Sequence, residues 1–436
     1  MASIVFGSVP IHGHVTPLLP LAAALVARGD RVRFLTGSRF AASVLATGAE
    51  HIPLPAEADF DDRNIVASFP ERERLSPVKA VAHDIEHIFV RPGGAQYTAL
   101  KGLMQQEAAD AVVTDPTFAG GALMVEAPRC ERPPVLVGGV VPLNLPAPDL
   151  APFGFGLPPL GGLAGRLRNG FLNNLTARLF AQANAAGAEV GRQVLGREPR
   201  IQLLEWLRHA DRIVQLTVPS FEYPRPETIA QHLTFVGPVS ASSAGQHALP
   251  AWWSDLDGSR PVIHVTQGTI ANTDLTELIR PTIDAFADRE PLVVVATGGV
   301  AVEGLGALPA NVRAAEFLPY EELLPRTSVM VTNGGYGGTQ FALRHGVPVV
   351  VAPGKEDKVE VAARVAWSGV GVNLRAQRPS PAQVRRGVER VLAVPSYRNA
   401  AQRTGSEIVA SSGALGFVHA VDAAIGSSRV EPCPAG

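Results

Sequence analysis

The sequence predicts an α/β fold with two doubly wound domains, each an open parallel sheet flanked by helices. Two observations carry this prediction. Short apolar runs alternate with segments of helical periodicity in the first part of the 436-residue chain, and the alternation starts again after residue 260. Between the two blocks, residues 238–250 are rich in Ser, Gly, Ala and Pro and lack periodicity, which is typical of a linker.

The first block, residues 1–237, begins with a strand–helix–strand unit. The apolar run Ile4 to Phe6 ends at Gly7, and apolar residues then recur at helical spacing between residues 18 and 26. The run 31–36 predicts the next strand and completes a βαβ unit. Further along the block we predict strands at 111–114, 135–137 and 213–217, and a helical region over 163–208.

The second block, residues 251–400, repeats the alternation. We predict strands at 261–266, 292–297, 329–332 and 347–351, and helices at about 274–288, 337–345 and 358–367. Residues 401–436 are predicted to hold an amphipathic helix that crosses back to the first domain, followed by a tail. Ligands of such sheets bind beyond the carboxyl ends of the strands, so we expect the functional site in the cleft between the domains.

Composition and charge exclude several classes of protein. With 46% hydrophobic and 18% charged residues the chain is not globally disordered, and its net charge of −2 argues against a general nucleic-acid or anionic-membrane binder. The two cysteines, Cys130 and Cys433, are too few for a disulfide framework. The sequence shows no signal-peptide pattern, and no apolar run reaches the roughly 20 residues of a membrane-spanning helix. We expect a cytoplasmic protein without a membrane span.

A glycine-rich turn carries the strongest chemical signal. The apolar strand 329–332 runs into Asn333-Gly334-Gly335-Tyr336-Gly337-Gly338-Thr339 and then into a helix. Glycines let backbone N–H groups approach an anion, and a helix N-terminus offers unpaired hydrogen-bond donors, so the turn predicts a phosphate site. No Gly-Lys-Ser/Thr closes it as in a P-loop, and Gln at position 340 breaks the G-x-G-x-x-G fingerprint. Close packing of helix on strand is the alternative explanation.

Polar side chains also follow two other predicted strands. After 347–351 comes Gly354-Lys355-Glu356-Asp357-Lys358, whose carboxylates can accept hydrogen bonds from a polyol. After the first strand comes a loop with His12 and His14, and a histidine there can face the cleft and act as a base near neutral pH. The plain alternatives are a solvated loop that caps the next helix and a surface histidine.

In order and spacing these motifs resemble the nucleotide-sugar glycosyltransferases of the GT-B type. They resemble more closely the UDP-glycosyltransferase-like family GT1, in particular its bacterial natural-product enzymes. That signature reads His-Gly-Gly-x-Gly-Ser/Thr, then Gly-Val-Pro, Pro and Asp-Gln, and it matches the segment 333–358. The family's N-terminal Gly-His-x-x-Pro matches Gly13, His14 and Pro17, so the resemblance covers nearly the whole chain. It implies two Rossmann-like domains that face each other across a cleft.

The resemblance implies a nucleotide-sugar site in the second domain. Phe317 would lie against the nucleobase, and Leu318 would offer backbone hydrogen bonds. Asp357, with Glu356 beside it, would hold sugar hydroxyls. The positions that match the family's phosphate contacts are Gly268, Thr269, Gly335, Gly337 and Gly338.

Four positions depart from the family's signature. Asn333 replaces the signature His and can still donate to a phosphate oxygen. Gly338 replaces Ser/Thr, with Thr339 beside it as a substitute hydroxyl. The Glu assigned to ribose is missing at position 341, with Gln340 beside it as a substitute, and Lys358 replaces the Gln after the acid.

The N-terminal motif implies the reaction. The family's base matches His14 and not His12, and its acid partner matches Asp115, just after the strand 111–114, where capping of the next helix is the alternative role. His14 would take a proton from a hydroxyl of a lipophilic small molecule. The oxygen would then displace the nucleotide of a UDP- or dTDP-sugar in one inverting step. Backbone donors at 335–339 would stabilise the departing diphosphate, so no metal or other cofactor is required.

Two other functions stay open from the sequence. A nucleotide-sugar 2-epimerase shares the fold and would act without an acceptor. An inactive nucleotide-sugar-binding protein would explain the altered signature at Asn333, Gly338 and Lys358. A separate His83-x-x-Glu86-His87 run fits a metalloprotease-like pattern, but no third ligand accompanies it. The sequence indicates no nucleic-acid partner and leaves the oligomeric state open.

Overall fold

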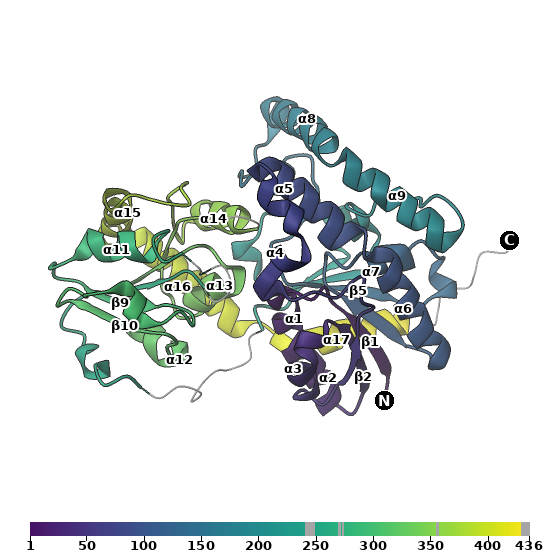
Figure 1. The fold of residues 1–436 in the computed structure, drawn as a ribbon, viewed down its shortest axis with the longest axis horizontal. Coiled ribbons are helices and arrows are strands. Elements are labelled where there is room, and N and C mark those ends of the chain that lie inside the picture. The colour runs from purple at the N-terminus through teal and green to yellow at the C-terminus, as the bar shows by residue number, and fades with distance from the viewer. Residues whose placement is uncertain (240–248, 269–271, 273, 355–356, 429–436) are drawn as a thin grey trace.

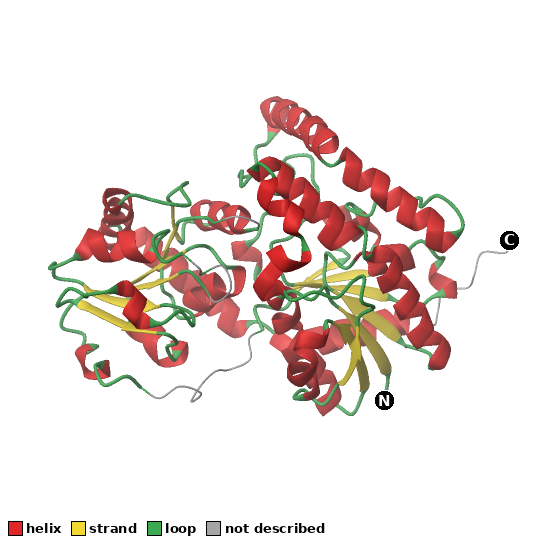
Figure 2. Ribbon diagram, viewed as in Figure 1, coloured by secondary structure: helices red, strands yellow, loops and turns green. Residues whose placement is uncertain are grey.

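The computed structural model describes residues 1–239, 249–268, 272, 274–354 and 357–428, and it confirms an α/β fold with two parallel sheets (Figures 1 and 2). The strand order is β3-β2-β1-β4-β5-β6-β7 in the first sheet and β10-β9-β8-β11-β12-β13 in the second. In both sheets the order reverses beside the first strand of the block, β1 or β8, which is the switch point of a doubly wound sheet.

The first sheet is buried on both faces. Ile4 and Phe6 of β1 lie in one apolar cluster and Val5 lies in another, because side chains alternate along a strand. The strands are β1 (Ser3–Gly7), β2 (Arg31–Thr36), β3 (Glu50–Pro53), β4 (Ala111–Thr114), β5 (Val135–Gly139), β6 (Arg212–Gln215) and β7 (Leu233–Phe235). The α-helices are α1 (His12–Val15), α2 (Leu19–Ala27), α3 (Ala41–Leu45), α4 (Ile65–Ser68), α5 (Pro77–Asp84), α6 (Gly93–Gln106), α7 (Ala119–Met124), α8 (Gly162–Leu179), α9 (Ala181–Leu195) and α10 (Glu227–Ala230).

The second sheet is built in the same way. Ile263 and Val265 of its first strand lie in one apolar cluster and Val262 lies in another. The strands are β8 (Val262–Thr266), β9 (Leu292–Ala296), β10 (Val312–Ala315), β11 (Val329–Thr332), β12 (Val349–Val351) and β13 (Gly371–Asn373). The α-helices are α11 (Ile279–Phe286), α12 (Tyr320–Leu323), α13 (Tyr336–Arg344), α14 (Lys358–Trp367), α15 (Pro381–Ala393), α16 (Pro395–Ala410) and α17 (Gly413–Ser428).

The structure departs from the predicted elements at the sheet edges and in two helical regions. The prediction misses β3, β7, β10 and β13, because each edge strand is short and partly exposed and so lacks a continuous apolar run. The region 163–208 holds two helices, and α9 ends at Gly196, whose φ of 69° closes it. Residues 400–425 are likewise divided between α16 and α17.

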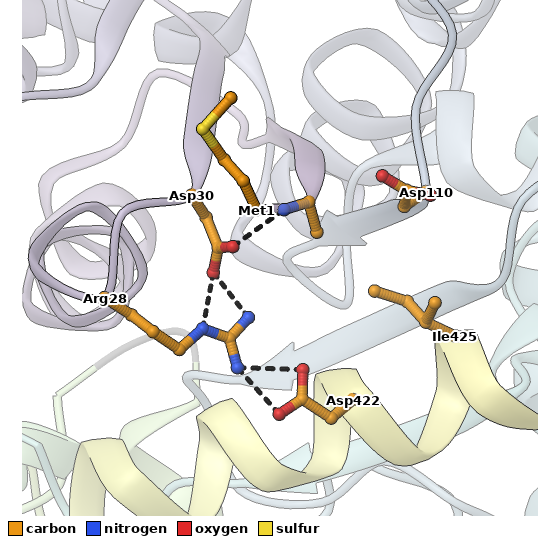
Figure 3. A pocket seen from close by; sticks show the side chains of 7 residues that line it. Met1, Arg28, Asp30, Asp110, Asp422 and Ile425 are labelled. Carbon is orange, nitrogen blue, oxygen red and sulfur yellow. Dashed lines mark hydrogen bonds and ion pairs between the residues drawn. The ribbon is translucent and has the colours of Figure 1, made fainter.

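Helix α17 lies against the first sheet although it follows the second sheet in the chain (Figure 1). Phe417 packs beside Phe6 of β1, with ring centroids 6.2 Å apart. On the helix surface, Asp422 pairs with Arg28, which also binds Asp30 (Figure 3). The cavity of about 320 Å³ beside this cluster lies near Ala2 and Asp110, at the amino ends of β1 and β4. It therefore lies on the sheet edge opposite the predicted site.

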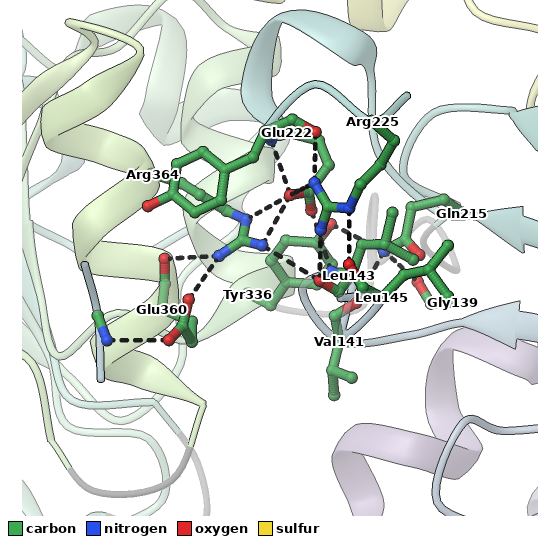
Figure 4. Close-up of polar contacts among 12 residues, drawn as sticks. Gly139, Val141, Leu143, Leu145, Gln215, Glu222, Arg225, Tyr336, Glu360 and Arg364 are labelled. Carbon is green, nitrogen blue, oxygen red and sulfur yellow. Dashed lines mark hydrogen bonds and ion pairs between the residues drawn. The ribbon is translucent and has the colours of Figure 1, made fainter. Parts of the chain in front are cut away.

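A buried ion-pair network joins the two halves of the chain. Arg364 of α14 donates to Glu222, which follows β6, at 2.7 Å and to Glu360 one helical turn away at 2.9 Å (Figure 4). Glu360 also accepts the backbone N–H groups of Gly154 and Gly156, at 2.8 and 2.9 Å. Desolvation disfavours the charged guanidinium, but the two carboxylates outweigh it and raise the pKa of Arg364.

The network predicts a large stability loss on truncation. Arg364→Ala would remove the ion pairs that bind the buried Glu222 at 2.7 Å and Glu360 at 2.9 Å, and would leave Glu222 with the more distant Arg225 at 3.8 Å. We therefore expect the free energy of unfolding to fall by about 3–5 kcal/mol in chemical denaturation. Arg378→Ala is the matched control, because Arg378 pairs with Asp274 and Glu277 at the surface and its loss costs at most about 1 kcal/mol. Equal losses for the two variants would contradict this account.

Candidate functional site

Parallel pairing of β1 and β4 brings two distant polar residues together. Gly7 pairs with Thr114, so the loops after both strands leave the same edge of the sheet. His14 lies in the short helix α1 after β1, and Asp115 directly follows β4. The imidazole Nδ1 lies 3.1 Å from a carboxylate oxygen of Asp115, although the residues are 101 positions apart in sequence.

Asp115 is fully buried and well supplied with hydrogen bonds. One oxygen accepts the backbone N–H of Val9 at 2.8 Å. The other accepts the backbone N–H of Thr117 at 2.7 Å and lies next to His14. Burial by itself raises the pKa of the carboxyl, but the charge interaction with His14 and these hydrogen bonds outweigh burial and lower the pKa. The group therefore stays ionised and can hold a proton on Nδ1 of the imidazole.

Thr117 is a member of this cluster that the sequence analysis did not identify. Its hydroxyl donates to Asp115 at 2.6 Å and lies 3.3 Å from Nδ1 of His14. The signal in the sequence is the run Asp115-Pro116-Thr117, in which a hydroxyl two residues after an aspartate can close a turn onto it. Thr117 thus supports both the carboxylate and the imidazole.

The two histidines of the loop have different surroundings. The backbone N–H of His12 donates to Asp62 at 2.7 Å, and Asp62 pairs with Arg39. Burial and the charge of Arg39 lower the pKa of the His12 imidazole. His14 instead lies beside Phe89, with ring centroids 6.2 Å apart. Of the two histidines, His14 has the bond to Asp115 that the predicted base requires.

The glycine turn after β11 has open space at the three glycines that are predicted to contact phosphate. A Cβ atom at Gly335, Gly337 or Gly338 would meet no atom within 4 Å. Gly334 is different, because its φ is 90° and a Cβ there would lie 2.9 Å from Val351. Gly335 caps α13, so the first N–H groups of this helix lack partners within the helix. The turn thus offers backbone hydrogen-bond donors to an anion.

The neighbouring polar side chains do not all face this opening. Thr339 is fully buried, and Gln340 is buried and donates to the carbonyl of Leu216 at 3.1 Å. The structure therefore does not bring these two side chains to the open face of the turn, in contrast to the prediction. Helical geometry explains the difference, because residues three and four positions after the start of α13 turn towards the protein.

Asn333 binds the neighbouring loop. Its amide donates to the carbonyl of Gln267, at the end of β8. The side-chain oxygen of Gln267 in turn accepts hydrogen bonds from the backbone N–H groups of Leu278 and Ile279 at 3.0 and 2.9 Å. The next residue, Gly268, has a φ of 82° and open space at its Cβ position. The loop after β8 therefore lies beside the glycine turn, whereas the predicted Thr269 lies outside the described residues.

The Phe317 ring and the glycine pair Gly298-Gly299 lie in the loops that follow β10 and β9. Phe317 is 44% exposed and Leu318 is buried. The backbone of Gly299 approaches the Phe317 ring, because a Cβ there would lie 3.2 Å from it. Gly298 approaches Gly268 even more closely, since a Cβ on Gly298 would lie 2.1 Å from the Gly268 carbonyl oxygen. The sequence analysis did not identify this glycine pair, although one residue, Thr297, separates it from the end of β9.

The start of α14 lies beside the glycine turn. Asp357 is the N-cap residue of α14, and its side chain makes no capping hydrogen bond. The N–H of Gly354 donates to the carbonyl of Asn333 at 3.2 Å, and the carbonyl of Lys358 lies close to Gly334. The structure therefore brings Asp357 and Lys358 to the turn. The predicted Glu356 lies outside the described residues.

Two patterns typical of metal sites are engaged in other contacts. His83 and His87 stack with ring centroids 4.3 Å apart, while Glu86 binds Arg91. Two Asp-x-Asp runs, 59–61 and 255–257, bind the Ser38 hydroxyl, the backbone N–H of Ser259 and the side chains of Arg63 and Arg313. Across the part of the chain that the structure describes, no group of three or more His, Cys, Asp and Glu side chains is placed to hold a metal ion.

The sequence matches known glycosyltransferases over nearly its full length. Residues 280–420 match the model of the erythromycin biosynthesis protein CIII-like C-terminal domain. The chain is 40% identical to 4'-demethylrebeccamycin synthase of Lentzea aerocolonigenes, over 97% of this chain and 99% of that protein. It is 35% identical to UDP-glycosyltransferase 2 of Phaeomoniella chlamydospora, over 93% and 91% of the two chains.

Solved structures agree with the sequence matches. The calicheamicin glycosyltransferase CalG4 superimposes with a TM-score of 0.69 at 26% identity, over 99% of this chain and 100% of that chain. The glycosyltransferase of kitacinnamycin superimposes with a TM-score of 0.74 at 21% identity, over 97% and 99%. The chain therefore belongs to the nucleotide-sugar glycosyltransferases of the GT-B fold, in the UDP-glycosyltransferase-like family GT1 with its natural-product enzymes.

Proposed function

We propose that this glycosyltransferase moves a sugar from a UDP- or dTDP-sugar to a hydroxyl group of a lipophilic small molecule, with inversion and with His14 as the general base. The observation that carries the proposal is the bond between Nδ1 of His14 and the ionised Asp115. In the tautomer that this bond favours, the proton lies on Nδ1 and the lone pair lies on Nε2. Nε2 is then the nitrogen that accepts the proton of the acceptor hydroxyl.

The proposed reaction is a single displacement. As His14 takes the proton, the acceptor oxygen bonds to the anomeric carbon and the bond from that carbon to the diphosphate oxygen breaks. The negative charge that grows on the diphosphate is stabilised by the first N–H groups of α13 and by the open backbone at Gly268. Because backbone dipoles can supply this stabilisation, the proposal needs no metal ion.

The remaining positions give each part of the nucleotide sugar a partner. The exposed ring of Phe317 can stack on the nucleobase. Asp357, at the N-terminus of α14, can accept hydrogen bonds from sugar hydroxyls. The relatives named UDP-glycosyltransferase or UDP-glucosyltransferase support UDP as the nucleotide, and 4'-demethylrebeccamycin synthase supports a natural-product acceptor. Their names favour transfer over epimerisation or binding alone.

A panel of UDP- and dTDP-sugars with hydroxylated aromatic acceptors tests the proposal. We expect nucleotide diphosphate to be released only when an acceptor is present, and the product to have the opposite anomeric configuration, which coupling constants in NMR spectra report. Release without an acceptor would point to hydrolysis or isomerisation. Absence of turnover with the whole panel would contradict the proposal.

Two variants separate chemistry from nucleotide binding. His14→Ala is expected to lower kcat by at least about 100-fold, since a general base contributes that much, while the Kd for UDP in calorimetry stays unchanged. Gly338→Val is expected to raise the Kd for UDP at least about tenfold, because its side chain would fill the open space before α13. Gly102→Val is the control for Gly338→Val, as Gly102 also has open space at its Cβ position but lies in α6.

The kinetics of His14→Ala decide its role. If kcat is unchanged in this variant, His14 is not the general base.

Asp115 predicts a pH-dependent contribution to stability. Because its folded pKa is below the ordinary value of about 3.9, the carboxylate stabilises the fold above that value and loses this effect as pH falls through the folded pKa. We therefore expect Asp115→Asn to lower Tm at pH 7 and the difference from wild type to narrow below about pH 4. Asp149→Asn, at an exposed carboxylate, is the control. A difference that stays constant with pH would contradict the assignment.

A further inference from the structure

Of the long helices that accompany the first sheet, α6, α8 and α9, helix α8 has the fewest buried residues. Of its 18 residues, the buried ones are Gly165 and Asn169. Gly165 permits close contact with the carbonyl of Leu160, where any Cβ would clash, and the amide of Asn169 donates to the carbonyl of Pro148 at 2.9 Å. Figure 1 shows α8 at the outer edge of the first domain. The helix is thus attached along one narrow line and presents the rest of its surface outward.

The outward surface of α8 carries an apolar stripe at every fourth position. Leu163, Leu167, Phe171 and Leu175 are 73%, 67%, 70% and 47% exposed. At 1.5 Å per residue the stripe extends over about 18 Å along the helix. Single exposed leucines are common on protein surfaces, but four large apolar side chains in line on one helix mark an interaction surface.

The charges that α8 itself carries have a single sign. Helix α8 contains Arg166, Arg168 and Arg178, and the sequence has no Asp or Glu between residues 150 and 188. The stretch therefore has a local net charge of +3, from these three arginines, although the whole chain has a net charge of −2. Pairing of α8 with its copy in a second molecule would bring these arginines together without a carboxylate from the helix, which disfavours self-association through this face.

An anionic lipid surface fits both properties of α8. Leu and Phe side chains can enter the boundary between headgroups and acyl chains, while arginines beside them bind lipid phosphates. We propose that α8 docks this enzyme onto anionic membranes by lying in their surface. Docking would place the enzyme where lipophilic acceptors concentrate, but it does not depend on the proposed role of His14.

Docking by α8 differs from crossing the membrane. Among the described residues, no single helix is both long and apolar enough to span a bilayer, whereas α16 and α17 meet the criteria together as a pair bent by 55°. The net charge of the chain argued against a general anionic-membrane binder. For the α8 face the local positive charge is decisive instead of the net charge. Electrostatic attraction to a membrane falls off within a Debye length of about 8–10 Å, so only charges near the docked face contribute to binding.

Vesicle flotation with the purified full chain tests the proposal. We expect the protein to float with vesicles that combine phosphatidylcholine and phosphatidylglycerol in equal parts, and to stay unbound with phosphatidylcholine alone. The variants Leu167→Glu/Phe171→Glu and Arg166→Glu/Arg178→Glu should each lower the bound fraction at least about tenfold. Leu415→Glu, on the 62%-exposed Leu415 of α17, is the matched control and should bind as wild type does.

The other outcomes each overturn the proposal. Wild-type protein that stays unbound, stripe variants that bind as well as wild type, or equal binding to both kinds of vesicle would contradict docking by α8. A dimer in light scattering that Leu167→Glu/Phe171→Glu converts to a monomer would identify a second copy as the occupant. Circular dichroism and transfer to a water-soluble acceptor should be unchanged in the α8 variants, which separates this test from that of the proposed function.

Discussion

The buried Arg364 is the constraint that holds the two halves of this enzyme in one arrangement. Its partner Glu222 lies between β6 and β7 of the first sheet, whereas Arg364 itself lies on a helix of the second sheet. Removing one partner of a buried ion pair is strongly destabilising, and Arg364 is the nearer of the two arginines that pair with Glu222, at 2.7 Å against 3.8 Å for Arg225. Glu360 extends the constraint to the loop at Gly154, and Asp357 is the N-cap residue of the same helix. The position proposed to hold the sugar is therefore fixed directly to the first domain.

The proposed base in the first domain, His14, depends on a different constraint, the parallel pairing of β1 and β4. Adjacent parallel strands end at the same edge, so the residues that follow them meet without any local sequence signal. The buried carboxylate of Asp115 is kept ionised by hydrogen bonds from Val9 and Thr117 and by the nearby imidazole. A buried ionised carboxylate can hold the imidazole in one tautomer, which is the property that the proposed mechanism requires.

Much of the candidate site could be predicted because its residues occur in short motifs. Gly335, Gly337 and Gly338 are consecutive or nearly so, and the structure shows open space at each of them. Thr339 and Gln340 were placed beside them from sequence position alone, and helical geometry turns both side chains inward. Gly298 lacked a motif, since its contact with Gly268 comes from strands that are neighbours only in the sheet. Thr117 had a local signal, since its hydroxyl binds Asp115 two residues before it, but its approach to His14 comes from the pairing of β1 and β4.

The sequence by itself determined the α/β class, the positions of most buried strands along the chain and the motifs at the carboxyl ends of the strands. These features are local, because a buried parallel strand needs a continuous apolar run and a phosphate turn needs adjacent glycines. Only the tertiary structure decided the edge strands, the contact of His14 with Asp115 and Thr117, and the outward direction of the α8 leucines. Those depend on which elements pack together, since periodicity alone does not tell whether an apolar stripe meets the core or faces outward.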